Sequence, residues 1–172
     1  MNCIIEELNT NNVSDYVKIN TKSWEETYKG IVNAEFLELI GTDSEINKAI
    51  ERKKKDINKE FDKSFLLKAD DKYVGVFRVC KSKDSNYKDI GELQALYLLN
   101  EVKHRGYGRI LFKKARDEVK KMGFNSMIAG CLSDNTNANS FYKHMGGELV
   151  GSRDFTLPNQ TLNENVYLFR EI

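Results

Sequence analysis

Residues 93–111 read LQALYLLNEVKHRGYGRIL, and this stretch decides the fold. Its first part is a run of leucine, alanine and tyrosine that belongs to a predicted strand over residues 90–99. From Tyr107 onwards, apolar residues recur about four positions apart, as on one face of a helix that Gly123 ends. These residues are Tyr107, Leu111, Ala115, Val119 and Met122. The stretch therefore predicts a strand, a glycine-bearing turn and an amphipathic helix in direct succession.

The turn between this strand and this helix has the features of an anion site. The first backbone N–H groups of a helix have no partner within the helix, and Gly106 and Gly108 lack the Cβ atoms that would obstruct a ligand. Between Lys103 and Lys121, eight Lys and Arg residues face two acidic residues, which leaves six positive charges in a chain of net charge +1. A solvated helix face with two incidental glycines is the alternative. The strand–turn–helix context favours a phosphate-bearing ligand.

Two common phosphate-binding motifs match this turn poorly. A dinucleotide fingerprint requires a third glycine at the position of Leu111, together with an acidic residue after the following strand. A P-loop requires G-x-x-x-x-G-K-[ST], which the sequence does not contain. The sequence also lacks a second βαβ unit. Both observations argue against a nucleotide-dependent oxidoreductase.

A second motif lies further along the chain, where residues 134–147 read DNTNANSFYKHMGG. Together the two segments resemble the GNAT acetyltransferase family, which has a loop [QR]-x-x-G-x-[GA] and a helix N-x-x-A-x-x-F-Y-x-x-x-G-[GF]. Residues 103–108 stand at the loop, with Lys103 where the family has Gln or Arg. Residues 24–31, WEETYKGI, are similar to the W-x-x-T-Y-x-G-I region of many bacterial members. The resemblance covers nearly the whole chain.

The resemblance implies both a fold and a reaction. The implied fold is the mixed α/β GNAT acyl-CoA N-acyltransferase fold, a central twisted sheet of about six to seven strands flanked by about four to five helices. The implied reaction is that of an acetyl-CoA-dependent N-acetyltransferase, which moves an acetyl group to a primary amine by direct attack in a ternary complex. The alternative is a non-catalytic acyl-CoA-binding sensor domain of the same fold.

The resemblance also implies roles for individual residues. The Leu98 backbone amide is the expected oxyanion donor, on a strand segment that splays from its neighbour, and Tyr142 is the expected general acid. A tyrosine that packs the last helix against the sheet is the alternative for Tyr142, and a helix N-cap is the alternative for Asn135. The residues expected to bind the cofactor are Leu96, Tyr97, Leu98, Lys103, His104, Arg105, Gly106, Tyr107, Gly108, Arg109, Asn135, Asn137 and Tyr142.

The strand predicted over residues 90–99 holds the candidate general base, Glu92. A period of two would place Glu92, Gln94, Leu96 and Leu98 on one face, from which Glu92 could take a proton from the ammonium of the substrate directly or through water. A salt bridge or a solvated strand end explains Glu92 equally well. Cys131 is expected in the core rather than as a nucleophile, because a free cysteine on an apolar strand is usually buried.

The substrate-facing residues are expected to be Trp24, Tyr28, Glu92 and Gln94. A cationic amine would favour aromatic faces and carboxylates. Trp24 and Tyr28 are one helical turn apart, so they fit a core stripe equally well. The basic run over residues 52–55 is expected to be a solvated helix face. The candidate acceptors are polyamines, aminoglycosides, amino acids and protein N-termini.

The other elements follow from local patterns. A single proline, Pro158, and the lack of a linker or repeat predict one domain over residues 1–172. Strands are expected over residues 3–8, 64–69, 73–80, 126–132, 147–155 and 165–169. Helices are expected from Asn11 or Asn12 towards Tyr28, over residues 33–40, from residue 42 towards Phe61, and over residues 135–145.

The composition sets limits on partners and location. A net charge of +1 gives no overall field for nucleic acid or an anionic membrane, and no apolar run is long enough to span a bilayer. The three cysteines are far apart, which favours neither disulfides nor a zinc site, so no metal is expected. The N-terminus lacks the pattern of a signal peptide. We therefore expect a cytoplasmic protein whose partner is a small-molecule or peptide amine, with a homodimer left open.

Overall fold

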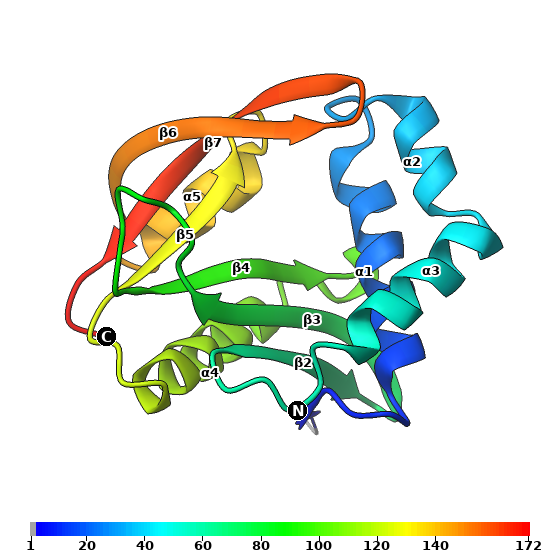
Figure 1. The fold of residues 1–172 in the computed structure, drawn as a ribbon, viewed down its shortest axis with the longest axis horizontal. Helices are drawn as coiled ribbons and strands as arrows, with labels where there is room; N and C mark the ends of the chain where they lie inside the picture. The colour runs from blue at the N-terminus through cyan, green and yellow to red at the C-terminus, as the bar shows by residue number, and fades with distance from the viewer. Residues whose placement is uncertain (1–2) are drawn as a thin grey trace.

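A computed structural model describes residues 3–172 as one seven-stranded sheet flanked by helices (Figure 1). The elements in chain order are β1 (Cys3–Glu7), α1 (Val13–Tyr28), α2 (Ala34–Ile40), α3 (Asp43–Lys54), β2 (Asp62–Ala69), β3 (Lys72–Lys81), β4 (Gly91–Leu98), a 3-10 turn (Asn100–Val102), α4 (Tyr107–Lys121), β5 (Met127–Leu132), α5 (Thr136–His144), β6 (Glu148–Leu157) and β7 (Gln160–Phe169). The sheet order is β1-β2-β3-β4-β5-β7-β6. The expected mixed α/β fold is confirmed.

The two faces of the sheet are covered by different helices. On one face, α4 and α5 bury a large cluster that includes Leu111, Phe112 and Tyr142 together with Phe77 of β3. On the other face, α1 packs its residues Val13, Tyr16 and Val17 over β2 and β3, and α3 packs beside it. The apolar period of α4 explains this arrangement, because Leu111, Ala115 and Val119 are completely buried.

Strands β4 and β5 separate soon after they meet. Their parallel pairing covers three positions, from Gly91 opposite Met127 to Leu93 opposite Ala129. Beyond these positions the two strands diverge, as Figure 1 shows in the centre of the sheet. The other edge of β4 continues to pair with β3 as far as Leu98. The second half of β4 therefore presents a backbone edge to the space between the two strands.

A bulge in β4 changes which of its side chains face each side of the sheet. Arg78 of β3 lies opposite Ala95 and the next residue, Val79, lies opposite Leu93, so Gln94 is an extra residue. Leu93 packs in the α4 cluster, and after the bulge Leu96 and Leu98 do so as well, whereas Tyr97 packs towards α1. The prediction that Glu92, Gln94, Leu96 and Leu98 share one face is therefore wrong, because the bulge breaks the period of two.

Turn residues and caps explain most of the element boundaries. The expected strands over residues 64–69 and 73–80 pair as the hairpin of β2 and β3, and Asp70 and Asp71 form its turn with φ angles of 46° and 61°. Asn33 caps α2 and Thr42 caps α3 through side-chain oxygens that accept hydrogen bonds from backbone N–H groups.

Two predicted element boundaries were wrong. The α3 helix ends at Lys54 instead of near Phe61, and β7 begins at Gln160 instead of Asn165.

The early start of β7 comes from its hairpin with β6. Leu157 pairs with Gln160 across a tight turn, and the pairing continues without a break to Leu168 opposite Glu148 except for one register shift. Residues 160–164 are mostly polar and do not show the alternation typical of a strand, so this part of β7 was not predicted. Among the helices of residues 3–172, none is long and apolar enough to cross a membrane.

Candidate active site

Two cavities meet where β4 and β5 diverge. The larger, of about 730 Å³, lies between β4, the start of α4 and α5, and the smaller, of about 500 Å³, lies between the sheet, α1 and α3. Both volumes are in the range of ligand sites. The residues that line both cavities are Tyr28, Gln94, Ala95, Tyr97, Gly130 and Cys131. The two cavities therefore adjoin each other at the gap between the strands.

The predicted anion turn lies at the mouth of the larger cavity. His104 and Gly106 have φ angles of 62° and 85°, and this left-handed backbone leads directly into α4 at Tyr107. No side chain among the described residues caps the N-terminus of α4, so its first N–H groups are available to a ligand. A Cβ atom on Gly108 would lie 3.3 Å from the ring of Phe141. The turn is therefore closely packed against α5.

The residues expected to bind the cofactor divide into two groups. Eleven of the thirteen line the larger cavity: Leu96, Tyr97, Leu98, Lys103, His104, Gly106, Gly108, Arg109, Asn135, Asn137 and Tyr142. The side chain of Arg105 is exposed outside the cavity, and the side chain of Tyr107 is buried in the core below α4. These two residues could contribute only their backbone groups or, for Arg105, a distant charge. Asn135 is also the N-cap of α5, because its side chain accepts a hydrogen bond from the N–H of Ala138 at 3.1 Å.

Tyr142 lies on the wall of the larger cavity and is 5% exposed. Its ring packs among aromatic side chains, namely Phe112, Phe141, Tyr167 and Phe169. Within residues 3–172, no side chain or backbone group makes a hydrogen bond with its hydroxyl. Burial raises the pKa of Tyr142 far above its usual range. The phenol is therefore protonated at neutral pH, as a proton donor must be.

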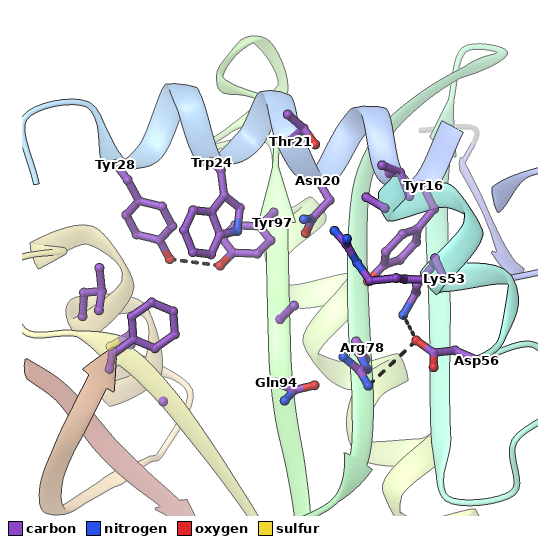
Figure 2. A pocket seen from close by; sticks show the side chains of 18 of the residues that line it. Tyr16, Asn20, Thr21, Trp24, Tyr28, Lys53, Asp56, Arg78, Gln94 and Tyr97 are labelled. Atoms are coloured by element: carbon purple, nitrogen blue, oxygen red, sulfur yellow. Dashed lines mark hydrogen bonds and ion pairs between the residues drawn. The ribbon is translucent and has the colours of Figure 1, made fainter. Parts of the chain in front are cut away.

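The smaller cavity has an aromatic wall next to the gap between the strands. Trp24 packs edge-to-face on Tyr28 with ring centroids 4.8 Å apart, and the hydroxyls of Tyr28 and Tyr97 are hydrogen-bonded at 3.0 Å. Figure 2 shows these three side chains together below α1, with Gln94 further along β4. Trp24, Tyr28 and Gln94, three of the four residues expected to face the substrate, thus all line the smaller cavity. Tyr28 is buried, as a core residue would be, and it also lines both cavities, as a substrate-facing residue would. The two interpretations of Tyr28 are therefore compatible.

Glu92 does not line either of the two cavities, although its side chain lies on the same face of the sheet as Gln94. It is 6% exposed, and its Oε1 accepts a hydrogen bond from Arg153 at 2.6 Å. The salt bridge that was the alternative interpretation of Glu92 is therefore present, with Arg153 as its partner. The expected roles of Glu92 as base and substrate ligand stay predictions, and its carboxylate is already held by a cation.

Arg153 also binds Glu164, a carboxylate that is not among the site residues predicted from the sequence. Its Nε donates to Glu164 at 2.6 Å, and its Nη1 donates to Asp84 at 3.1 Å. Unlike Glu92 and Asp84, Glu164 lines the smaller cavity. Its carboxylate lies over Gly130, where a Cβ atom would be 2.4 Å from the carboxyl carbon. Glu164 therefore lies beside the residues that the two cavities share.

Burial raises the pKa of Glu164 above its ordinary value. The hydrogen bond and charge of Arg153 lower it, whereas the charges of Glu92 and Asp84 raise it again. A carboxylate of this kind accepts a proton more readily than an exposed one. No sequence signal identified it, because Glu164 lies in the part of β7 that was not predicted as a strand.

A basic group lies at the other end of the smaller cavity. Lys53 was expected on a solvated helix face, but it is 9% exposed and its Nζ lies 3.0 Å from Asp56 and 4.8 Å from the centre of the Tyr16 ring. That expectation is wrong for Lys53, because α3 turns this side chain under the helix towards the sheet. Arg78 of β3 and Arg52 of α3 line the same end.

Cys131 lines both cavities, yet it is unsuited to act as a nucleophile. It is buried on β5, and burial raises the pKa of its thiol to about 12. The reactive form of a cysteine is the thiolate, so at neutral pH this side chain is an inert thiol. The described residues contain no group of three or more His, Cys, Asp or Glu side chains arranged to hold a metal ion.

Solved structures of known proteins share this fold. In fold, the chain is similar to the PaiA N-acetyltransferase of Thermoplasma acidophilum in complex with coenzyme A, with a TM-score of 0.77, 20% identity and 99% of each chain covered. It is also similar in fold to yncA of Salmonella typhimurium with its cofactor acetyl-CoA, with a TM-score of 0.67, 14% identity and 99% and 94% of the two chains covered.

The sequence itself is also similar to known acetyltransferases. It is 27% identical to YuaI of Bacillus subtilis (strain 168), described as an uncharacterized N-acetyltransferase, over 93% of this chain and 88% of that protein. The model of the acetyltransferase (GNAT) family matches residues 23–147, a segment that contains the anion turn, both walls of the larger cavity and Tyr142. The chain belongs to the acetyltransferase (GNAT) family.

Proposed function

We propose that this protein transfers an acetyl group from acetyl-CoA to a primary amine by direct attack in a ternary complex. The observation that carries the proposal is the pair of cavities joined at the gap between β4 and β5, because two substrates can then meet from opposite faces of the sheet. The solved relatives named with coenzyme A or acetyl-CoA support the choice of donor. The acetyl thioester supplies the activated carbonyl that an amine attacks.

The larger cavity carries groups that suit the parts of coenzyme A. The uncapped N-terminus of α4, preceded by Lys103 and His104, suits a pyrophosphate. Gly106 and Gly108 allow the backbone to come close to it. The cavity continues along the open edge of β4, where backbone groups can bind the amides of a pantetheine arm. These residues would hold the donor with its thioester at the gap between the strands.

The groups beside the gap suit the chemistry of acetyl transfer. As the amine attacks, negative charge develops on the carbonyl oxygen, and we assign its stabilisation to the Leu98 backbone N–H. As the carbon–sulfur bond breaks, Tyr142 donates its phenol proton to the departing thiolate. The attacking nitrogen then loses its second proton to the resulting phenolate, directly or through water, which leaves the neutral amide and restores Tyr142. Cys131 remains a thiol and forms no acetyl-enzyme, which favours direct attack.

We assign the proton acceptor to Glu164 rather than Glu92. The amine arrives as an ammonium ion, and one proton must leave it before the nitrogen lone pair can attack. Glu164 lines the acceptor cavity, lies beside Gly130 and has a raised pKa, whereas Glu92 is outside the cavity. Both bind Arg153, so the ion pair itself does not distinguish the two.

The reaction is tested by release of free thiol from acetyl-CoA across a panel of primary amines. We expect thiol release to depend on the amine and to be accompanied by an acetylated product in mass spectra. A protein that binds acetyl-CoA in calorimetry but releases no thiol with any amine would instead be the sensor domain of the same fold. Failure to bind coenzyme A at all would contradict both interpretations.

Replacing Gly108 by valine is expected to weaken coenzyme A binding by about tenfold or more. A branched side chain must displace the Phe141 ring, since even a Cβ atom would lie 3.3 Å from it, and it would narrow the approach to the α4 N-terminus. The matched control is Ile110→Val, which places the same residue outside the cavity on the same helix. Calorimetry on both folded variants checks this. Equal affinities would show that the turn does not bind the cofactor.

A further inference from the structure

The smaller cavity is negatively charged at the end next to β7. Arg153 is the centre of this cluster, and three carboxylates bind it within 3.1 Å: Asp84, Glu92 and Glu164. One cation against three anions leaves two negative charges. Glu164 is the member of the cluster that lines the cavity, so this end presents a carboxylate to an incoming ligand.

The opposite end, between α3 and β3, is positively charged. Its cations are Arg52, Lys53, Lys59 and Arg78, and its carboxylates are Asp56 and Asp62. Four cations against two anions leave two positive charges. Of these groups, Arg52, Lys53, Asp56 and Arg78 line the cavity itself, and they too sum to two positive charges.

The positive charge is not neutralised by the protein. Arg78 forms two hydrogen bonds with Asp62, and Lys53 binds Asp56. Arg52, by contrast, forms no ion pair with any carboxylate of residues 3–172, and its side chain is exposed to the cavity and to solvent. Burial lowers the pKa of Lys53, and the positive charge of Arg78 lowers it further. An anion at this end would relieve that repulsion.

The two charged ends are separated by the width of several strands. Arg78 lies on β3 and Glu164 on β7, with β4 and β5 between them. Three strand spacings of about 4.8 Å would place the two backbones about 14 Å apart, and the gap between β4 and β5 adds to this separation. In Figure 2, Lys53, Asp56 and Arg78 lie on one side of the cavity, Trp24 and Tyr28 lie on the other, and Gln94 is between them.

We propose that the acceptor is an amine whose far end carries an anionic group, a carboxylate or a phosphate. This proposal rests on the proposed function. The ammonium of such a molecule would lie beside Glu164 and the aromatic rings near the gap, where the acetyl group is delivered. Its anionic group would lie at Arg52 and Lys53, with Arg78 behind them. A diamine of the same length would place its second cation against this positive end and bind weakly.

The test compares three amines of matched length: 6-aminohexanoate, hexylamine and 1,6-diaminohexane. A charge-assisted hydrogen bond at the far end is worth about 1.5–3 kcal/mol, which is about ten- to one-hundredfold in affinity. We therefore expect kcat/KM to be at least about tenfold higher for the acid than for hexylamine, and lowest for the diamine. Equal values, or a preference for the diamine, would overturn the proposal.

Charge reversal at Arg52 locates the anion site. Because Arg52 is exposed at the surface of α3, Arg52→Glu should fold normally. It should lower kcat/KM for 6-aminohexanoate by about tenfold, leave hexylamine within about twofold and raise the value for the diamine. Lys55→Glu makes the same change three residues further on, outside the cavity, and should leave all three values within about twofold. Identical effects of the two variants would show that the overall electrostatic field, and not a specific anion site at Arg52, determines the preference.

A binding measurement separates this proposal from the proposed reaction. With the protein saturated with coenzyme A, calorimetry should show 6-aminohexanoate binding at least about tenfold more tightly than hexylamine, and Arg52→Glu should abolish the difference. If this preference appears without thiol release from acetyl-CoA, the anion site is supported and the transferase proposal fails. If thiol is released with no preference in binding or turnover, the transferase proposal is supported and the anion site fails.

Discussion

Replacing Glu164 by glutamine is expected to lower kcat/KM at pH 7 by about 10²- to 10³-fold. A primary amine with a pKa of about 10.4 is neutral in only about one molecule in 2,500 at pH 7. Without a proton acceptor, the variant must use that neutral fraction from solution. Because Arg153 keeps Glu92 and Asp84 as partners, its charge is not left unpaired by the change. Initial rates of thiol release at low amine concentration measure the effect.

The pH profile distinguishes this catalytic role from a structural one. In the wild type, kcat/KM should rise with pH as Glu164 loses its proton, at a pKa above the ordinary value for glutamate, and then stay level towards the pKa of the amine. In Glu164→Gln, the rate should rise about tenfold for each pH unit from 7 to 9, as the neutral amine accumulates. A uniform loss at every pH would indicate damage to the site rather than a missing base.

Two further variants control for the ion-pair cluster. Asp84→Asn also removes a carboxylate partner of Arg153, yet Asp84 is outside both cavities, so this variant should keep the wild-type profile. Glu92→Gln tests the residue that the strand pattern suggested. If the tenfold rise with each pH unit appears in Glu92→Gln and not in Glu164→Gln, the base is Glu92 and our assignment is wrong.

Replacing Tyr142 by phenylalanine is expected to lower kcat and kcat/KM together by about 10²- to 10⁴-fold, the usual contribution of a general acid. The hydroxyl has no hydrogen-bond partner among the described residues, and the ring keeps its contacts with Phe112 and Phe169. Stability and coenzyme A affinity should therefore change little. Single-turnover and steady-state rates on a productive amine, with thermal unfolding and calorimetry on the same sample, measure these quantities.

The matched control for Tyr142 is Tyr167→Phe. This tyrosine also lies in the aromatic cluster and is completely buried, but its hydroxyl donates a hydrogen bond to Asn139 at 2.7 Å and it lines neither cavity. Its replacement should reduce stability by about 1 kcal/mol and leave kcat nearly unchanged. A near-wild-type kcat in Tyr142→Phe would remove the acid role and leave protonation of the thiolate to solvent or to another group.

The sequence determined the local elements and the cofactor side of the site. The helix after the anion turn was predicted to begin at Tyr107 and end near Gly123, and it does so because its apolar face, its glycines and its basic last turn are all local signals. The residues of the cofactor cavity lie in two short segments, 94–109 and 135–145, apart from a few neighbours. Continuous segments of this kind can be recognised in a sequence because each turn or helix start orients its own backbone groups.

The tertiary structure alone brought together the charged groups on the acceptor side, whereas Trp24, Tyr28 and Gln94 were already expected there from the sequence. Glu164, Arg52 and Arg78 come from β7, α3 and β3, and nothing in their local sequence relates one to another. Their positions depend on the order of β3, β4, β5 and β7 in the sheet and on the packing of α3 beside α1. Strand order, register and bulges are fixed by pairing between distant segments. The side chains of a site built across several strands therefore come together only when the sheet has formed.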